Sequence, residues 1–126
     1  MVIVIKKIIF YMLDKIDSNI LEFSYYDDEP LHIIIQTIME LRYFKSPEEI
    51  VKRLHELYKK GYFSVSIVKE KISDEYVKLS NLEKKDLLEY VKKHKKDNFQ
   101  KFPNDEYYFK TTAEAYKLVD QDKLEI

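Results

Sequence analysis

The chain has 126 residues, 22 lysine and arginine residues against 23 aspartate and glutamate residues, no cysteine and a single glycine. A chain of this length forms one domain around a single core, and the lack of cysteine excludes a disulfide scaffold, thiolate metal sites and thiol catalysis. The single glycine also excludes glycine-rich phosphate-binding loops, because these need several residues at positive φ or close to the ligand.

The first segment, residues 1–13, is strongly apolar, but it does not have the pattern of a membrane span. Lys6 and Lys7 interrupt it, and its apolar runs are far shorter than the about 20 residues that cross a bilayer. No small-residue cleavage site follows, so the segment does not resemble an export signal. We therefore expect a cytoplasmic protein.

Apolar residues recur at helical spacing from Ile5 to Ile16 and predict a first helix. Residues 17–19 are expected to end it, because Asp, Ser and Asn favour caps and turns. Residues 19–26 form a short segment rich in apolar and aromatic residues and predict a small strand. The acidic residues 27–29 precede Pro30 and predict a second helix over residues 31–44, with the proline at its first position.

Ser46 and Pro47 mark the clearest helix start in the chain. Ser46 is expected to be the N-cap, Pro47 the first helical residue, and Glu49 the acid that completes a capping box. The helix over residues 47–60 is expected to bury Leu54 and its apolar neighbours. It should end where Gly61 takes up a left-handed conformation.

After Gly61 the apolar periodicity changes to two, which is typical of strands. The remaining predicted elements are a strand over 62–68, a polar turn over 69–75, a returning strand over 76–80, a helix over 81–96, a turn at 103–105, a strand over 107–110 and a short helix from 112 to about 119. Leu87, Leu88 and Val91 are expected to face the core. The predicted fold class is α+β, mostly α.

This order of elements resembles a winged helix-turn-helix of the MarR and PadR type. Residues 55–63, His-Glu-Leu-Tyr-Lys-Lys-Gly-Tyr-Phe, resemble the end of a recognition helix that runs into the first wing strand. Residues 76–80, Tyr-Val-Lys-Leu-Ser, and the lysine-rich helix after them are similar to the second wing strand and the closing helix. The resemblance suggests an archaeal or archaeal-virus protein, with a winged-helix domain over residues 1–97 and a C-terminal extension over residues 98–126 packed on it.

The resemblance implies a dimeric transcription regulator that binds double-stranded DNA, with residues 47–60 in the major groove. The candidate groove contacts are Lys52, Arg53, His55, Lys59 and Lys60. The candidate phosphate contacts are Lys69, Lys71, Lys92, Lys93, Lys95 and Lys96. An ordinary solvated helix face is the alternative for residues 47–60, because Glu48, Glu49 and Glu56 share that surface.

Positive charge is concentrated in the middle of the chain. Residues 45–97 contain 14 cations and 10 acids, whereas residues 1–44 contain 4 and 7, and residues 98–126 contain 4 and 6. Such a local excess favours phosphate contacts even on a nearly neutral protein. The alternative is that lysines near a helix C-terminus only complement the helix dipole.

Ile3, Phe10 and Tyr11 lie off the main apolar stripe of the first predicted helix. A helix that is apolar on more than one side is buried in a core or between subunits. Because winged-helix proteins often dimerise through terminal helices, the resemblance implies a homodimer with these residues in its interface. The alternative is that the C-terminal extension covers them within one chain.

Metal binding and enzymatic activity are not expected. His32, His55 and His94 lie on different predicted helices and form no His-x-x-x-His pair. No arrangement typical of catalysis is recognisable, so we expect no cofactor. The main rival to DNA binding is a protein–protein interaction module that docks a partner through surface tyrosines and phenylalanines, which the acidic first third and the near-zero net charge favour.

Overall fold

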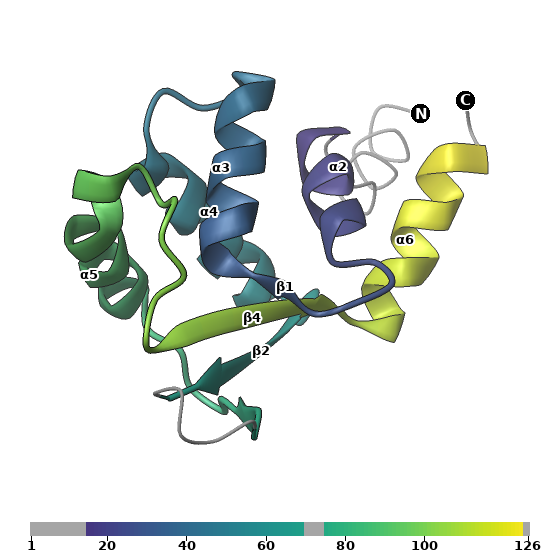
Figure 1. Cartoon of the computed structure of the whole chain (residues 1–126). Helices are drawn as coiled ribbons and strands as arrows, with labels where there is room; N and C mark the ends of the chain where they lie inside the picture. Colours follow the sequence, from purple (N-terminus) through teal and green to yellow (C-terminus); the bar gives the residue numbers. More distant parts are fainter. Residues whose placement is uncertain (1–14, 70–74, 125–126) are drawn as a thin grey trace.

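The computed structural model describes residues 15–69 and 75–124 of the chain (Figure 1). Its elements are α2 (Lys15–Phe23), β1 (Glu29–Pro30), α3 (Leu31–Leu41), α4 (Pro47–Lys59), β2 (Phe63–Val68), β3 (Val77–Lys78), α5 (Lys84–His94), the 3-10 turn η1 (Lys95–Asp97), β4 (Glu106–Thr111) and α6 (Ala113–Leu124). The fold class is α+β, as predicted. Ile3, Phe10, Tyr11 and Lys71, and most of the first predicted helix, lie outside the described residues.

The strands form an antiparallel sheet in the order β1-β4-β2-β3. The predicted hairpin of β2 and β3 is present, but it is short, with Ser66 opposite Lys78 and Ile67 opposite Val77. The main partner of β2 is β4, which pairs with it from Phe63 opposite Thr111 to Val68 opposite Glu106. Residues predicted as a C-terminal extension therefore supply a central strand.

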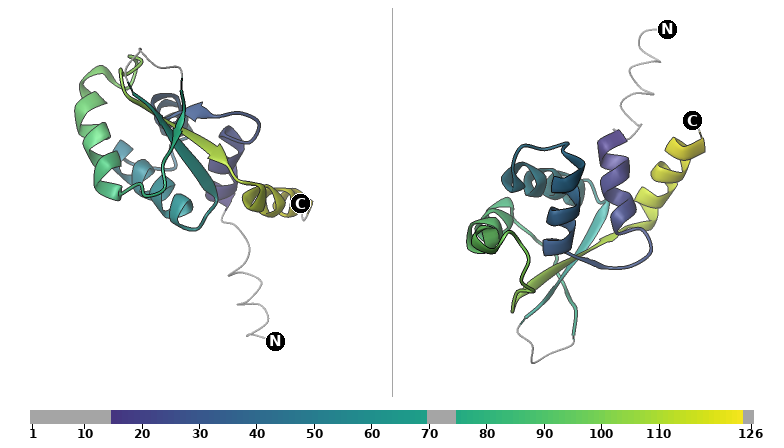
Figure 2. Two further views of the ribbon diagram at one scale, coloured as in Figure 1. Left: turned by 90° about the horizontal axis from the view of Figure 1, so that it is seen from below. Right: turned by 45° about the horizontal axis from the view of Figure 1, so that its top comes forward.

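Helices α3, α4 and α5 lie on one side of the sheet, and α2 and α6 lie side by side next to them (Figures 1 and 2). The core lies between these helices and the sheet. Its fully buried side chains include Leu21, Leu31, Ile35, Ile38, Ile50, Leu54, Val65, Leu87 and Phe109. Burial of these apolar side chains is the main driving force of the fold.

Helix α2 contradicts two predictions: residues 17–19 do not end a helix, and residues 19–26 do not form a strand. Ile20 and Leu21 are buried together with Asp17, at the i, i+3, i+4 spacing of one helix face. Asp17 lies inside the helix because its carboxylate Oδ1 pairs with Arg53 Nη1 at 2.7 Å, and Thr111 donates its hydroxyl hydrogen bond to the Leu21 carbonyl at 2.6 Å. These tertiary contacts outweigh the local preference of polar residues for caps.

Pro30 is the N-cap of α3 and not its first helical residue. Its φ of −71° and ψ of 141° are extended, and it pairs with Tyr108 at the edge of the sheet, where a proline is tolerated. The second helix also ends earlier than predicted. Arg42 takes a left-handed conformation with φ 60°, and its N–H donates to the Met39 carbonyl.

Helix α4 confirms the predicted helix start. Ser46 Oγ accepts a hydrogen bond from the Glu49 N–H at 3.3 Å. The capping box is not closed, however, because Glu49 Oε2 accepts from the Lys45 N–H at 3.0 Å. Gly61 follows the helix with φ +83°, the left-handed conformation that was predicted.

Helix α5 begins at Lys84, later than predicted, because α4 holds Leu82 in the link before it. The Leu82 N–H donates to the Tyr58 hydroxyl at 3.1 Å, and the Leu82 carbonyl lies 2.8 Å from His55 Nε2. Both backbone groups of Leu82 are thereby satisfied without helix formation. Leu87 and Val91 are buried as predicted, whereas Leu88 is only partly buried.

Candidate nucleic-acid interface

The exposed face of α4 alternates in charge. Its exposed side chains are Glu49, Lys52, Glu56 and Lys59, and the exposed Lys60 follows as the C-cap. An anionic phosphate backbone is attracted by the lysines of this face and repelled by the two carboxylates. The face is therefore a moderate rather than a strongly basic candidate for a groove-binding surface.

Arg53, a predicted groove contact, is already engaged within the fold. Its guanidinium lies 2.7 Å from Asp17 Oδ1 and 3.7 Å from Glu56 Oε2, and 5.5 Å from the centroid of the Phe44 ring. The ion pairs balance its positive charge, and the cation–π contact fixes its position. Arg53 consequently joins α4 to α2 instead of projecting from the protein.

His55 is also a predicted groove contact, but the structure places it in the contact between α4 and α5. Its side chain is buried, and Nε2 lies 2.8 Å from the Leu82 carbonyl oxygen. Because a carbonyl oxygen only accepts, Nε2 carries the hydrogen. In this arrangement His55 cannot reach a base, so that prediction does not fit the structure.

Helix α5 runs antiparallel to α4. Leu82, before the start of α5, contacts Tyr58 near the end of α4, whereas Lys95, after the end of α5, pairs with Glu48 Oε1 in the first turn of α4 at 3.0 Å. This ion pair partly neutralises Lys95, one of the predicted phosphate contacts. The basic end of α5 thus lies beside the first turn of α4.

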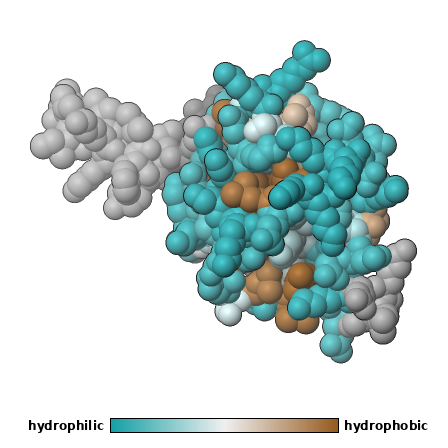
Figure 3. All heavy atoms as spheres, turned by 90° about the vertical axis from the view of Figure 1, so that its left-hand side faces the viewer, coloured by the Kyte–Doolittle hydropathy of each residue, from teal (hydrophilic) through white to brown (hydrophobic). Residues whose placement is uncertain are grey.

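The most accessible cations of the predicted set lie on α5 and η1. Lys92, Lys93 and Lys96 are exposed, and none of them has a carboxylate of the described residues within ion-pair distance. Figure 3 shows this side of the molecule, where hydrophilic side chains surround a central hydrophobic patch. Lys69 is exposed just beyond the end of β2. Three of the predicted phosphate contacts therefore lie together on α5 and η1, whereas Lys69 belongs to a different part of the fold, at the end of β2.

A cavity of about 360 Å³ lies beside the exposed face of α4. It is lined by Ile16, Tyr43, Phe44, Glu49, Lys52, Arg53 and Glu56. Both charge signs are present among these residues, so the cavity does not select an anion or a cation by net charge. Lys52 is the cation of this lining that has no carboxylate of the described part of the chain within ion-pair distance.

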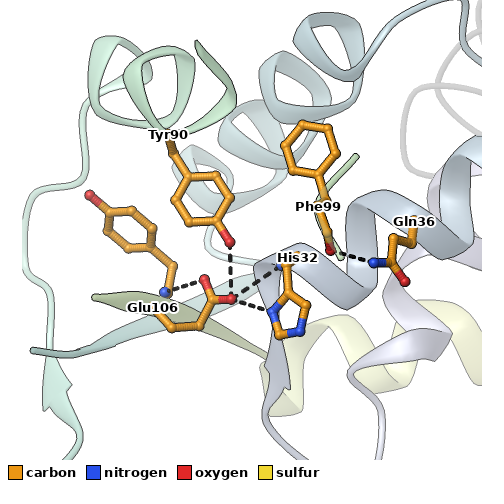
Figure 4. A network of polar contacts seen from close by, with 6 residues as sticks. His32, Gln36, Tyr90, Phe99 and Glu106 are labelled. Atoms are coloured by element: carbon orange, nitrogen blue, oxygen red, sulfur yellow. Dashed lines mark hydrogen bonds and ion pairs between the residues drawn. The ribbon is translucent and has the colours of Figure 1, made fainter. Parts of the chain in front are cut away.

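A buried carboxylate, which the sequence analysis missed, connects α5 to the rest of the domain (Figure 4). Glu106, at the start of β4, is 1% exposed. Its Oε2 accepts hydrogen bonds from the Tyr90 hydroxyl at 3.0 Å and from the His32 N–H at 3.3 Å, and lies 2.5 Å from His32 Nδ1. Its Oε1 accepts from the Tyr107 N–H at 2.8 Å.

Burial is the dominant electrostatic influence on this cluster. It raises the pKa of Glu106, against the lowering effect of the hydrogen bonds from His32, Tyr90 and Tyr107. Burial and the neighbouring Glu106 also raise the pKa of the Tyr90 phenol far above its ordinary value. Because Glu106 is enclosed and already has several donors, it joins α3, α5 and β4 and is not placed to act on a substrate.

No single feature distinguished Glu106 from the other acidic residues in the sequence. The one available signal is its position directly before the apolar and aromatic residues 107–109. The predicted strand began at residue 107, one residue after Glu106. Its partners His32 and Tyr90 lie 74 and 16 residues away. A cluster assembled from such distant positions has no local spacing pattern.

The described residues show neither a metal centre nor a membrane span. In residues 15–69 and 75–124, no group of His, Asp and Glu side chains is placed to hold a metal ion. None of the helices described here is long and apolar enough to cross a bilayer. In comparisons with known proteins, no protein-family model, no curated protein and no solved structure matches the chain.

Proposed function

We propose that the chain is a winged-helix protein that binds double-stranded DNA and acts in the cytoplasm as a dimeric transcription regulator. The observation that carries this proposal is the strand order β1-β4-β2 around α2, α3 and α4. A winged helix combines a small helical bundle with a β-hairpin, the wing, that pairs with a short strand between the first helices. Here β2 and β4 correspond to the wing, and β1 corresponds to the short strand.

This assignment differs from the one based on sequence, in which residues 76–80 formed the second wing strand. Strand β4 pairs with β2 along its whole length and leads into α6. Thr112, at that junction, donates its hydroxyl hydrogen bond to the Gly61 carbonyl at 2.7 Å and accepts from the Ala115 N–H at 3.3 Å. The base of the proposed wing is thereby joined to the end of α4, and residues 69–105 are an insertion between its strands.

In this proposal α4 lies in the major groove and α5 contacts the adjacent phosphates. Arg53 and His55 are engaged within the fold, so the groove contacts are assigned to Lys52, Lys59 and Lys60. The phosphate contacts are assigned to Lys92, Lys93 and Lys96, which are exposed beside α4. Lysines at phosphates supply affinity but not sequence preference.

The proposal is tested by fluorescence anisotropy with a labelled random-sequence duplex over a series of salt concentrations. We expect binding at about 50 mM salt that weakens steeply as salt rises. Lys92→Ala combined with Lys96→Ala should weaken the binding of every duplex alike and lower the slope of log K against log salt by about 2, roughly 1 for each phosphate contact.

The matched control is Lys15→Ala combined with Lys117→Ala, since these lysines are exposed on the packed pair α2 and α6. It removes the same charge and should leave the salt slope unchanged. Absence of duplex binding by the wild-type protein at low salt would contradict the proposal. If both double variants lowered the salt slope equally, the binding would depend on net charge in general and not on Lys92 and Lys96.

We also propose that the chain forms a homodimer through Ile3, Phe10 and Tyr11. The support is the excess of apolar residues in that part of the sequence. Light scattering after gel filtration should give twice the chain mass of 15.3 kDa, and Phe10→Asp should give the monomer mass. A monomer at micromolar concentration of the wild-type chain would contradict this assignment.

A protein-docking module without DNA binding is the second candidate. It is favoured by exposed aromatic side chains on the surface, of which Tyr26 is 85% and Phe102 57% exposed. Such residues are common anchors of protein interfaces. The duplex titration separates the two functions, because a docking module predicts no salt-dependent DNA binding.

A further inference from the structure

The sheet has one face that no described helix covers. Viewed from below, the strands lie in front and α3, α4 and α5 lie behind them (Figure 2, left). The residues on the helix side are buried, as shown by Val65 and its partner Phe109, which are both 0% exposed. The opposite face is therefore a surface whose chemistry is set by the strand register.

The register brings a defined set of side chains onto this outer face. Tyr108 lies opposite Ser66, and Ser66 lies opposite Lys78, and directly opposed residues share a face. The alternation of side chains along a strand adds Ser64 and Lys110, which are also opposed. All of these side chains are half-buried or exposed, as expected for a face without a covering layer.

Two tyrosines form an aromatic surface at one end of this face. The rings of Tyr76 and Tyr108 contact each other edge to face, with centroids 4.8 Å apart and an interplanar angle of 73°. Tyr76 is 54% exposed. Burial and the proximity of Tyr76 raise the pKa of Tyr108; a tyrosine phenol is neutral at about pH 7 in any case and does not repel an anion.

The accessible charged side chains that β3 and β4 place on the outer face are lysines; Glu106, which shares the row of Tyr108 and Lys110, is buried. Lys78 is exposed, and Lys110 is half-buried with Nζ 3.5 Å from the Tyr25 carbonyl. Glu106, the acid of β4, is buried among its own hydrogen-bond donors, and Glu29 lies in the row of Phe109 on the helix side. Exposed acids lie at the ends of the strands, with Asp28 before β1, Glu75 next to Tyr76 and Asp105 before β4. An anionic ligand is therefore favoured where Lys78 and Lys110 lie, on β3 and β4.

We propose that the outer face defined by Tyr76, Lys78, Tyr108 and Lys110 binds single-stranded nucleic acid. Unpaired bases would stack on the tyrosine rings, the lysines would contact phosphates, and the Ser64 and Ser66 hydroxyls would hydrogen-bond to bases or sugars. A duplex hides the faces of its bases and cannot stack in this way. This site is separate from α4 and α5 and does not depend on the proposed binding of double-stranded DNA.

The test measures anisotropy of labelled oligothymidylate and oligouridylate of about 15 nucleotides, within the length that such surfaces cover. Tyr76→Ala and Tyr108→Ala should each lower the affinity for the oligonucleotide about tenfold, because loss of one stacked base has an effect of this size. Tyr108→Phe keeps the ring and should bind like the wild type. Lys78→Ala combined with Lys110→Ala should weaken binding and its salt dependence.

Tyr43→Ala is the matched control, because Tyr43 is 44% exposed and lies between α3 and α4, outside this face. It should leave binding unchanged. Tyr76 is more than half exposed, so its replacement preserves the fold. The Tyr76→Ala variant therefore keeps the test valid if Tyr108→Ala proves unstable. Circular dichroism checks that both variants are folded. Failure of the wild-type protein to bind either oligonucleotide, or unchanged binding by Tyr76→Ala, would overturn the proposal. Unchanged oligonucleotide binding by the Lys92→Ala and Lys96→Ala variant would support a separate site, whereas an equal loss would overturn it.

Discussion

The imidazole Nδ1 of His32 lies 2.5 Å from the carboxylate Oε2 of Glu106, although 74 residues separate them in the chain. The contact joins the first turn of α3 to the first residue of β4, and the Tyr90 hydroxyl adds α5 to the same oxygen. A buried carboxylate is tolerated only when hydrogen bonds replace its lost hydration. The cluster therefore fixes how α3, α5 and β4 lie relative to one another.

Glu106→Ala should destabilise the protein strongly. The substitution leaves the Tyr90 hydroxyl and the N–H groups of His32 and Tyr107 without their buried acceptor. We expect a loss of about 3 kcal/mol or more in the free energy of unfolding, measured by urea denaturation. Glu89→Ala is the control, because Glu89 is an exposed acid on α5 and should change stability by about 0.5 kcal/mol or less.

The stability contribution of Glu106 should decrease as pH rises. Burial raises its pKa, so the folded protein binds this proton more tightly than the unfolded chain. The stabilisation that Glu106 contributes by holding its proton is therefore fully present below the ordinary glutamate pKa. It is lost as pH rises through the pKa of Glu106 in the folded protein. Glu106→Gln cannot ionise, so the stability of the wild type relative to this variant should fall in urea titrations as pH rises above the ordinary glutamate pKa of about 4. A relative stability that rises with pH would show that hydrogen bonding outweighs burial.

His94 should make the protein less stable in mild acid. Burial and then the neighbouring Lys93 lower its pKa, with His32 acting in the same direction and Asp97 opposing them. The unfolded chain then takes up a proton that the folded protein binds less well, so stability is lost as pH falls from about 7 to about 5. His94→Gln should reduce this loss, measured as the urea midpoint at the two pH values. An identical pH dependence in wild type and variant would contradict the prediction.

Gly61→Ala should destabilise the protein through its backbone alone. Gly61 has φ +83°, and a Cβ placed there would meet Glu114 Oε2 at 3.8 Å, an ordinary van der Waals contact. The strain of a left-handed conformation for an L-residue is about 1–2 kcal/mol, which a urea unfolding curve resolves. Gly61→Asn should lose less, because Asn adopts this conformation more readily. Equal stability of the alanine variant and the wild type would show that the turn can relax.

Helix α4 shows how much local sequence can specify. Ser46, Pro47 and Gly61 act on their immediate neighbours, through a side-chain cap, a preset φ and a left-handed turn. The buried arc around Leu54 also follows from helical periodicity. The bounds of α4 were therefore predicted to within one residue.

Helix α2 shows where the same reasoning fails. Residues 17–19 have the local pattern of a helix end, but Asp17 gains Arg53 as a partner from a different helix. The same partner removes Arg53 from the predicted groove contacts, and Leu82 removes His55. A pattern within one helix cannot show which exposed positions a second helix will cover.

Composition and short-range periodicity alone determined the α+β class, the exclusion of thiol chemistry and the limits of α4. Only the tertiary structure decided that β4 lies beside β2, that Glu106 is buried with His32, and that the outer face of the sheet gathers Tyr76 and Tyr108. The physical reason is the distance along the chain over which each kind of interaction acts. Caps and helical stripes depend on residues a few positions apart, whereas strand pairing and the burial of charge depend on which distant segments exclude water together.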